Sequence, residues 1–172
     1  MREGPEIRRL GAADLRAYKA LRDEMLEAHP EAFTSDAFTE RHRRADDYLP
    51  RLGLDQPDGG HVLLGAWDSG GLTGAIGLER DRRLKVRHIG HLVGMMVRER
   101  SRKLGIGGAL LDALLAEGRA AALELLTLTV TEGNDSAIRL YERAGFVRFG
   151  LLQKAIKVGE RYHAKVYMAK TL

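Results

Sequence analysis

The chain has 172 residues, of which 44% are hydrophobic and four are proline; this length can bury one core but hardly two, so we expect a single domain spanning residues 1–172. The absence of cysteine excludes disulfides, thiolate zinc sites and a cysteine nucleophile, and with no secretory signal or membrane-spanning stretch we expect a soluble, cytoplasmic protein. The net charge of +4 comes from basic and acidic residues mixed along the chain, which is typical of a solvated surface, so we expect neither a nucleic-acid nor a membrane partner.

The first part of the chain is predicted to form helices and then a hairpin. Apolar residues recur at helical spacing from Asp14, a candidate N-cap, until Pro30 stops the pattern. The charged stretch 36–49 favours a second helix, which could cover a binding cleft. Two apolar runs, 61–67 and 72–78, are separated by Asp-Ser-Gly-Gly, so they predict a β-hairpin.

The rest of the chain alternates between strand and helix patterns. A third apolar run, 88–97, contains Gly90 and Gly94, and glycines inside a strand suggest a bulge or the close approach of another backbone or a ligand. Strands that first form hairpins and later alternate with helices predict an α+β fold, a mixed sheet with helices on its faces. The later elements are a helix over 106–121, a strand over 125–131, a helix over 134–144, a strand over 146–149 and a last strand over 162–168.

The segment 97–111 combines a strand end, a basic loop, a glycine-rich turn and a helix start. Free amides at a helix N-terminus attract anions, and glycines let phosphate oxygens approach the backbone. A dinucleotide fingerprint would need glycine at Leu110, and a P-loop would need Gly-Lys followed by Ser or Thr, so neither fits. The segment therefore predicts a phosphate site of another kind, with close helix-to-strand packing as the alternative role of the glycines.

The same segment resembles the first signature of the GNAT acetyltransferases, in which Arg or Gln is followed after two residues by Gly, and one residue later by Gly or Ala. Arg102, Gly105 and Gly107 match it. Residues 134–146 resemble the second signature of that family, which is Asn, a helix with Leu-Tyr, and then Gly-Phe. The resemblance covers about 63–149 and implies a central, mostly antiparallel twisted sheet of six to seven strands, with about four helices on its faces.

The resemblance also implies an activity and a cofactor. GNAT enzymes use acetyl-CoA, so the expected reaction is direct transfer of an acetyl group to the primary amine of a small molecule in a ternary complex. In the family, the loop wraps the pyrophosphate of coenzyme A, and strand amides just before it pair with pantetheine. The cofactor-binding residues that the resemblance implies are Met95, Met96, Val97, Arg102, Lys103, Leu104, Gly105, Ile106, Gly107, Gly108, Ala109, Asn134, Ser136, Ala137 and Tyr141.

Acetyl transfer to an amine needs an uncharged nucleophile, a donor for the oxyanion and a proton for the departing thiolate. Asn134 and Tyr141 are seven residues apart, so both can face one groove from the same helix. The resemblance assigns Tyr141 the role of general acid and the backbone amide of Val97 that of oxyanion donor. The alternative for Tyr141 is a half-buried aromatic residue that only packs.

Two residues are candidates for the catalytic base. Period two predicts that His91 shares one strand face with Met95 and Val97. An imidazole titrates near neutrality and can accept a proton from an ammonium, although a purely structural, hydrogen-bonded histidine is an equal alternative. Glu79, at the end of the preceding strand, is the reserve base, and its alternative role is an exposed hairpin carboxylate. The remaining histidines are scattered, so no metal site is expected.

The front end of the chain is where we expect the acceptor site. A closed pocket lined by Phe33, Phe38 and Tyr48 would favour a small amine, whereas an open acidic groove would favour a protein N-terminus or lysine as acceptor. A coenzyme A-binding sensor without turnover is a third possibility.

The tail of the chain resembles a subset of small bacterial GNAT members, which follow the turn at Gly159 with an acidic pair. This chain departs from them, because Ala164 and Lys165 stand at those positions. The terminal strands could pair across a two-fold axis, so a homodimer is a further hypothesis.

Overall fold

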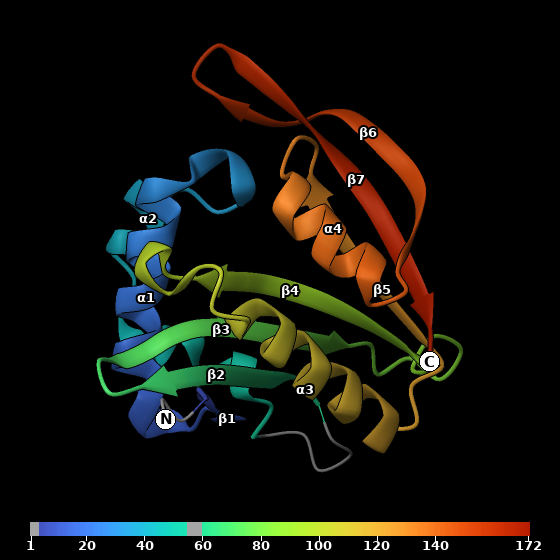
Figure 1. Ribbon diagram of the computed structural model, residues 1–172, viewed down its shortest axis with the longest axis horizontal. Coiled ribbons are helices and arrows are strands. Elements are labelled where there is room, and N and C mark those ends of the chain that lie inside the picture. The colour runs from blue at the N-terminus through green and yellow to red at the C-terminus, as the bar shows by residue number, and fades with distance from the viewer. Residues whose placement is uncertain (1–3, 55–59) are drawn as a thin grey trace.

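The computed structural model describes residues 4–54 and 60–172 and contains one seven-stranded sheet (Figure 1). All neighbouring strands pair antiparallel except β4 and β5, which are parallel. The α+β class and the mostly antiparallel sheet expected from the sequence are therefore confirmed. The strands, in sheet order, are β1 (Glu6–Arg9), β2 (Val62–Asp68), β3 (Gly71–Arg80), β4 (Ile89–Val97), β5 (Leu125–Thr131), β7 (Arg161–Thr171) and β6 (Val147–Val158).

Helices cover both faces of this sheet (Figure 1). Helix α1 (Leu15–Ala28) packs on one face, with a core that includes Leu63, Ala75 and Met96. Helix α3 (Ile106–Ala120) packs on the other, in a larger cluster that also contains residues of α4. The remaining α-helices are α2 (Ala37–Arg41) and α4 (Asp135–Arg143). No helix in the described parts of the chain is long and apolar enough to cross a membrane.

The helix predicted over 36–49 is wrong as one element, because two capping interactions divide it. Asp36 accepts a hydrogen bond from the Thr39 amide at 2.7 Å, which starts α2. Asp47 accepts one from the Arg44 amide at 2.8 Å, which starts a separate 3-10 helix over Ala45–Leu52. The sheet also ends differently from the prediction, since β6 continues beyond residue 149 and forms a long hairpin with β7.

Strand β4 is interrupted by a bulge at Gly94, where φ is 58° and the register with β3 shifts between Ala75 and Gly77. Before the bulge, Leu92 belongs to the cluster under α3, so His91 faces the α1 side. After the bulge, Met95 and Val97 pack against that same α3 cluster. The prediction that His91 shares a face with Met95 and Val97 is therefore wrong, because the extra residue reverses the period-two pattern.

Beyond this region β4 and β5 separate. Their parallel pairing is limited to Ile89–His91 with Leu125–Thr127. The two strands therefore diverge toward their C-terminal ends, and the backbone there is not closed by a strand ladder. This divergence creates the space in which the candidate site lies.

Candidate active site

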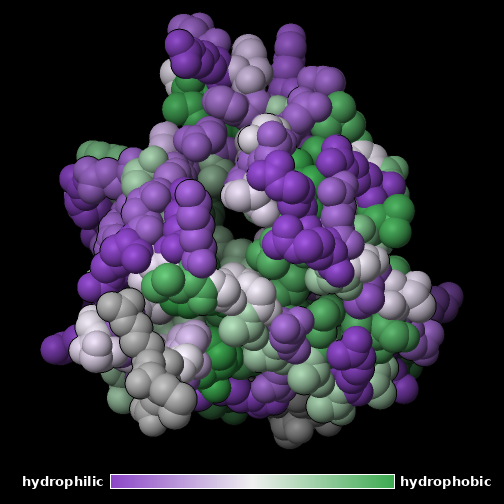
Figure 2. All heavy atoms as spheres, in the orientation of Figure 1, coloured by the Kyte–Doolittle hydropathy of each residue, from purple (hydrophilic) through white to green (hydrophobic). Residues whose placement is uncertain are grey.

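A cavity of about 370 Å³ lies where β4 and β5 diverge, and we call it the central cavity. Figure 2 shows a hollow in the middle of the corresponding face of the molecule. Its walls come from segments far apart in the sequence, which the splayed strands bring together. The lining residues are Arg22, Ala32, Phe33, Thr34, Ser35, Arg51, Glu79, Leu92, Val93, Gly94, Met95, Thr129, Val130, Thr131, Asn134, Ala137, Tyr141 and Lys165.

Helix α4 contributes Asn134 and Tyr141 to one wall of the central cavity. Asn134 is the N-cap of α4, and its side-chain oxygen accepts from the Ala137 amide at 3.4 Å. The Tyr141 ring packs edge-on against Phe146, with centroids 5.9 Å apart. Among the described residues no group hydrogen-bonds to its hydroxyl. Burial raises the pKa of Tyr141 above that of free tyrosine, so the phenol stays protonated at neutral pH and can donate.

Glu79 and His91, the two predicted bases, are directly opposite each other on β3 and β4. Their side chains lie on the same face of the sheet, because paired residues of antiparallel strands do so. Glu79 lines the central cavity, but His91 does not. Instead, His91 Nδ1 is 2.6 Å from the Thr127 hydroxyl on β5, where the strands are still paired. The geometry thus favours Glu79 over His91 for contact with an acceptor.

The start of α3 offers the features of an anion site. Gly105 is the N-cap in the left-handed region, with φ of 78°. A Cβ on Gly108 would meet nothing within 4 Å, so this side of the first turn is open. By contrast, a Cβ on Gly107 would lie 3.3 Å from Leu140 Cδ2, so this glycine also permits helix packing. The open side at Gly108 is compatible with the predicted phosphate site, and the close approach of Leu140 at Gly107 shows that this glycine also has a packing role.

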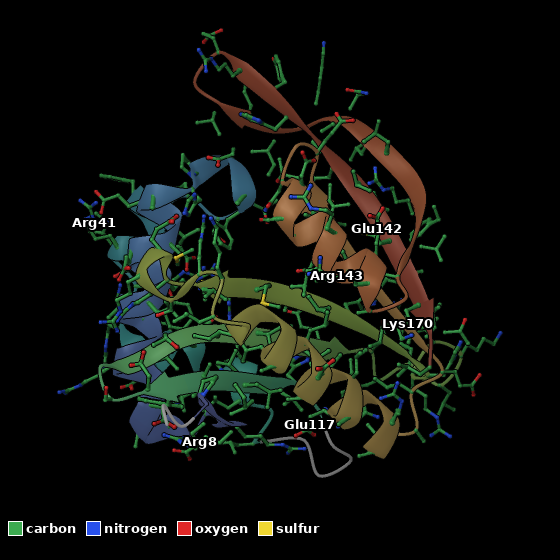
Figure 3. All side chains as sticks on the ribbon, viewed as in Figure 1. Arg8, Arg41, Glu117, Glu142, Arg143 and Lys170 are labelled. Atoms are coloured by element: carbon green, nitrogen blue, oxygen red, sulfur yellow. The ribbon has the colours of Figure 1, made fainter. Side chains whose placement is uncertain are left out.

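The cation of the first signature is held at the side of this turn. Arg102 donates to His29 Nε2 at 2.9 Å and pairs with Glu99 at 2.9 Å. Lys103 is exposed, and Arg143 lies on the side of α4 toward α3 (Figure 3). On the opposite side of α4, Glu142 pairs with Arg148 of β6 at 2.9 Å. Arg102 and Lys103 thus place positive charge beside the start of α3, where it adds to the positive end of the helix dipole.

The other predicted cofactor residues differ in whether their side chain or only their backbone is accessible to a ligand. Leu104 is 61% exposed, whereas the Ile106 side chain is buried, so only the backbone of Ile106 is accessible to a ligand. Met96 is buried under α1, while Met95 lines the central cavity. The predicted set therefore borders the central cavity and the turn before α3, with several members contributing backbone rather than side chain.

The predicted aromatic acceptor pocket is only partly present. Phe33 lines the central cavity, but Phe38 is 75% exposed and stacks on His42 instead. Tyr48 is fully buried below the wall and donates its hydroxyl hydrogen to Glu40 at 2.7 Å. The prediction is wrong for Phe38 and Tyr48, because the Phe38 side chain is exposed to solvent and the Tyr48 side chain is buried in the core.

Sequence reasoning missed the three cationic residues that line the central cavity. Arg22, Arg51 and Lys165 line it, and none was predicted as a site residue. Lys165 had a signal, since it lies in a period-two strand where the resembled subset has an acidic residue. Arg22 and Arg51 had none, because they lie on surface-like helical segments that fold over the cavity only in three dimensions.

Comparison of the sequence with known proteins identifies the family. A model of the Acetyltransferase (GNAT) family matches residues 18–146. Mycothiol acetyltransferase of Geodermatophilus obscurus is 30% identical over 148 residues, covering 85% of this chain and 46% of that protein, so the chain spans about half the length of this curated relative.

Solved structures show the same fold. Ribosomal-protein-alanine N-acetyltransferase from Brucella melitensis superposes with a TM-score of 0.83 at 26% identity, over 97% of this chain and 99% of that chain. A GNAT superfamily phosphinothricin acetyltransferase from Sinorhizobium meliloti, solved in complex with AcCoA, gives a TM-score of 0.84 at 21% identity, over 99% of this chain and 89% of that chain. At 21% identity, the similarity to the Sinorhizobium meliloti enzyme shows a shared fold.

Proposed function

Since the chain belongs to the GNAT acetyltransferase family, we propose that it transfers the acetyl group of acetyl-CoA to the primary amine of a small molecule, directly within a ternary complex. The observation that carries this proposal is the central cavity, whose walls carry the Tyr141 phenol and the Glu79 carboxylate. The start of α3, which suits an anion, follows the end of β4 along the chain. No covalent enzyme intermediate is needed.

The residues around the start of α3 fit coenzyme A. The amides of the first turn and the open side at Gly108 suit a pyrophosphate, which needs hydrogen-bond donors and close backbone approach. Arg102 and Lys103 add positive charge beside that turn. Met95 and its neighbours at the splayed end of β4 suit the pantetheine arm, which can pair with a free strand edge. When bound, acetyl-CoA supplies the acetyl group as a thioester.

The residues of the central cavity would then move the protons. Glu79 accepts the proton that the acceptor's ammonium must lose before its nitrogen can attack the thioester carbon. The backbone amide of Val97 donates to the carbonyl oxygen as negative charge develops there. Tyr141 gives its phenolic proton to the departing sulfur and recovers one from the reacting nitrogen. Overall, the ammonium loses two protons, of which one ends on sulfur and one in solvent.

The size and charge of the central cavity support a small acceptor. A volume of about 370 Å³ is at the low end for ligand sites and would also hold the acetyl end of the cofactor. A basic peptide would need an acidic groove, but Glu79 is the one carboxylate among the described lining residues. Acetylation of a protein N-terminus or lysine is therefore the less favoured alternative.

The test is thiol release from acetyl-CoA across amino acids, polyamines, aminoglycosides, arylamines and basic peptides. We expect turnover with one class of small amine. Tyr141→Phe should lower kcat by roughly 100-fold or more with little change in affinity for acetyl-CoA, because only the proton donor is removed. Tyr162→Phe, at an exposed position of β7, is the matched control and should keep full activity. Tight acetyl-CoA binding without turnover on any amine would instead identify a sensor.

We also propose that two copies of the chain pair through β6. This strand is an edge of the sheet and carries exposed apolar side chains, including Phe149 and Leu151. An edge strand of this kind has free backbone groups that a second copy can pair with across a two-fold axis.

A further inference from the structure

The lining of the central cavity carries more basic than acidic side chains. Three cationic residues line it, namely Arg22, Arg51 and Lys165, against the single carboxylate of Glu79 among the described lining residues. Cations that face a cavity are repelled by a cationic ligand and attract an anionic one. Whether this charge is free for a ligand depends on what each of the three residues already contacts.

Arg22 is not free, because the fold neutralises it. Its Nε is 2.8 Å from Glu40 Oε2, and both side chains are 5% exposed. A second nitrogen, Nη2, donates to the Ser35 hydroxyl at 2.8 Å. Arg22 therefore holds the wall of the cavity in place and does not add unpaired charge to it.

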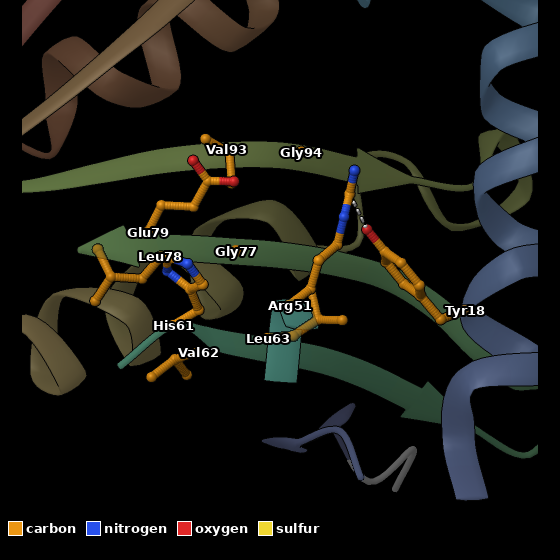
Figure 4. Close-up of a pocket in the computed structure, with 10 residues that line it drawn as sticks. All are labelled: Tyr18, Arg51, His61, Val62, Leu63, Gly77, Leu78, Glu79, Val93 and Gly94. Atoms are coloured by element: carbon orange, nitrogen blue, oxygen red, sulfur yellow. Dashed lines mark hydrogen bonds between the residues drawn. The ribbon is translucent and has the colours of Figure 1, made fainter. Parts of the chain in front are cut away.

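Arg51, by contrast, has no carboxylate partner in the described part of the chain. Its Nη1 donates to the Tyr18 hydroxyl at 2.8 Å, and its guanidinium lies 5.2 Å from the centre of the Tyr48 ring. Figure 4 shows the Arg51 side chain extending past Gly77 toward Gly94. Glu79 lines the same small crevice as Arg51, yet the two form no ion pair. These contacts fix the direction of the guanidinium and leave its charge uncompensated.

Lys165 is the second uncompensated cation and comes from a different element. It lies on β7 opposite Thr131 of β5, which also lines the central cavity. The Lys165 ammonium is partly buried and has no acidic partner among the described residues, and burial lowers its pKa from the ordinary value. A partly buried cation without a counter-ion is less favourable than a solvated one, so an anion at this place would be stabilising.

We propose that the acceptor is a small primary amine that also carries a carboxylate or a comparable anionic group, which Arg51 and Lys165 bind while the amino group lies at Glu79. This inference rests on the acetyl transfer proposed above and names the chemical class of its acceptor. The simplest ligands of this kind are free amino acids. One carboxylate and two cations on the cavity wall complement the one positive and one negative group of a zwitterion.

The first experiment compares acceptors that differ only in the anionic group. Phenylalanine and methionine are assayed beside phenethylamine, 3-(methylthio)propylamine and the two amino acid amides, with aminomethylphosphonate as a second kind of anion. The decarboxylated amines are more basic than the amino acids and the amides are less basic, so they bracket the effect of amine protonation. We expect kcat/KM to be at least tenfold higher for a panel member that carries an anionic group than for its counterparts that lack one.

The second experiment removes the cations. Lys165→Gln and Arg51→Gln should each raise KM for the preferred anionic amine by roughly 10- to 100-fold, which is the loss expected for a charge-assisted hydrogen bond. The change in kcat should be smaller, and KM for the amines that lack an anionic group should stay within about threefold of the wild-type value. Lys165→Arg should restore most of the affinity. Lys157→Gln, an exposed lysine on the same hairpin, is the control and should change neither value.

These outcomes separate the inference from the proposed function. Turnover with polyamines, aminoglycosides or other amines that lack an anionic group, in preference to those that carry one, would overturn the inference. The proposed acetyltransferase activity would still stand. If no amine is acetylated, calorimetry with phenylalanine and methionine in the presence of coenzyme A decides the inference alone. Binding that is lost in Lys165→Gln supports it, and absence of binding overturns it. If Arg51→Gln lowers activity equally for amines with and without an anionic group, Arg51 only stabilises the cavity wall and the part of the inference that assigns it to the anionic group is overturned.

Discussion

The charged residues around the central cavity have distinct tasks that burial and partners decide. Arg22 and Glu40 are buried and paired with each other, so they act on the structure of the wall. Arg51 and Lys165 face the same space without carboxylate partners in the described chain, so they are available to a ligand. Sequence alone could not separate these pairs, because all four residues occupy polar positions of segments that look solvent-facing.

Glu40 should be a strong determinant of stability. It accepts hydrogen bonds from Arg22 at 2.8 Å and from Tyr48 at 2.7 Å. Glu40→Gln leaves the Arg22 charge buried without a counter-ion, so we expect the free energy of unfolding in urea to fall by about 3 kcal/mol. The control, Glu27→Gln, breaks only the exposed ion pair with Arg41 and should cost less than about 1 kcal/mol. Equal losses in the two variants would contradict the prediction.

The same carboxyl group predicts a pH dependence. Burial alone would raise the pKa of Glu40, but the hydrogen bonds from Arg22 and Tyr48 and the nearby charges outweigh it and lower the pKa below its ordinary value of 4.5. Glu40 therefore contributes stability that is complete above pH 4.5 and is lost as the pH falls through the lowered value. The difference in unfolding free energy between wild type and Glu40→Gln should shrink on acidification, and a difference that grows would refute this assignment.

At the scale of elements, most strands and helices could be predicted from the sequence, whereas the full length of β6 and the irregular backbone could not. The hairpin of β2 and β3 and the helices α3 and α4 follow from periodicity and turn residues. The bulge at Gly94 reverses the direction of Met95 and Val97, and a period-two argument has no means to count an extra residue. The break after α2 depends on side-chain caps that compete with a helix pattern of similar strength. Phe38 and Tyr48 were misplaced for this reason.

The first turn of α3 allows a prediction in which stability and binding change in opposite directions. A methyl group on Gly108 would meet no protein atom within 4 Å and would replace the most flexible residue in a helix, so Gly108→Ala should stabilise the fold by up to about 1 kcal/mol. The same methyl group would occupy the space that a phosphate needs. We expect the Kd for acetyl-CoA, measured by calorimetry, to rise at least about tenfold.

The control for this variant is Gly150→Ala on β6, which lies outside the turn before α3 and where a Cβ would make ordinary contact at 3.7 Å from Tyr167. It should leave the Kd for acetyl-CoA unchanged. An unchanged Kd in Gly108→Ala, together with a higher melting temperature, would mean that this turn does not approach the cofactor.

At the scale of the whole molecule, the site exists because the sheet is only partly closed. The core under α3 contains Leu92 from before the bulge of β4 and contacts Met95 and Val97 from after it, whereas the core under α1 contains Met96. The β6–β7 hairpin extends from the far side of the divergence (Figure 1) and carries Lys165 to the central cavity. One wall thus depends on the two strands at this end of the sheet.

That arrangement bears on the assembly of the protein. Strand β6 is the sheet edge beside β7, and its Val147 and Phe149 side chains are 70% and 62% exposed. A two-fold pairing through β6 would cover these apolar groups and restrain the hairpin that carries Lys165. We therefore expect light scattering at micromolar concentration to give twice the mass of one chain.

Charges on the edge strand should abolish this pairing. Phe149→Lys combined with Leu151→Lys should give the mass of a single chain, because like charges at both partners repel and apolar contact is lost. Leu84→Lys, at an exposed apolar residue outside the sheet edges, should leave the dimer intact. If pairing holds the hairpin, the double variant should also raise KM for the acceptor amine while acetyl-CoA affinity, which depends on the α3 turn, stays the same. A wild-type protein that is monomeric at these concentrations would leave β6 as an open edge and would separate the acceptor site from any assembly.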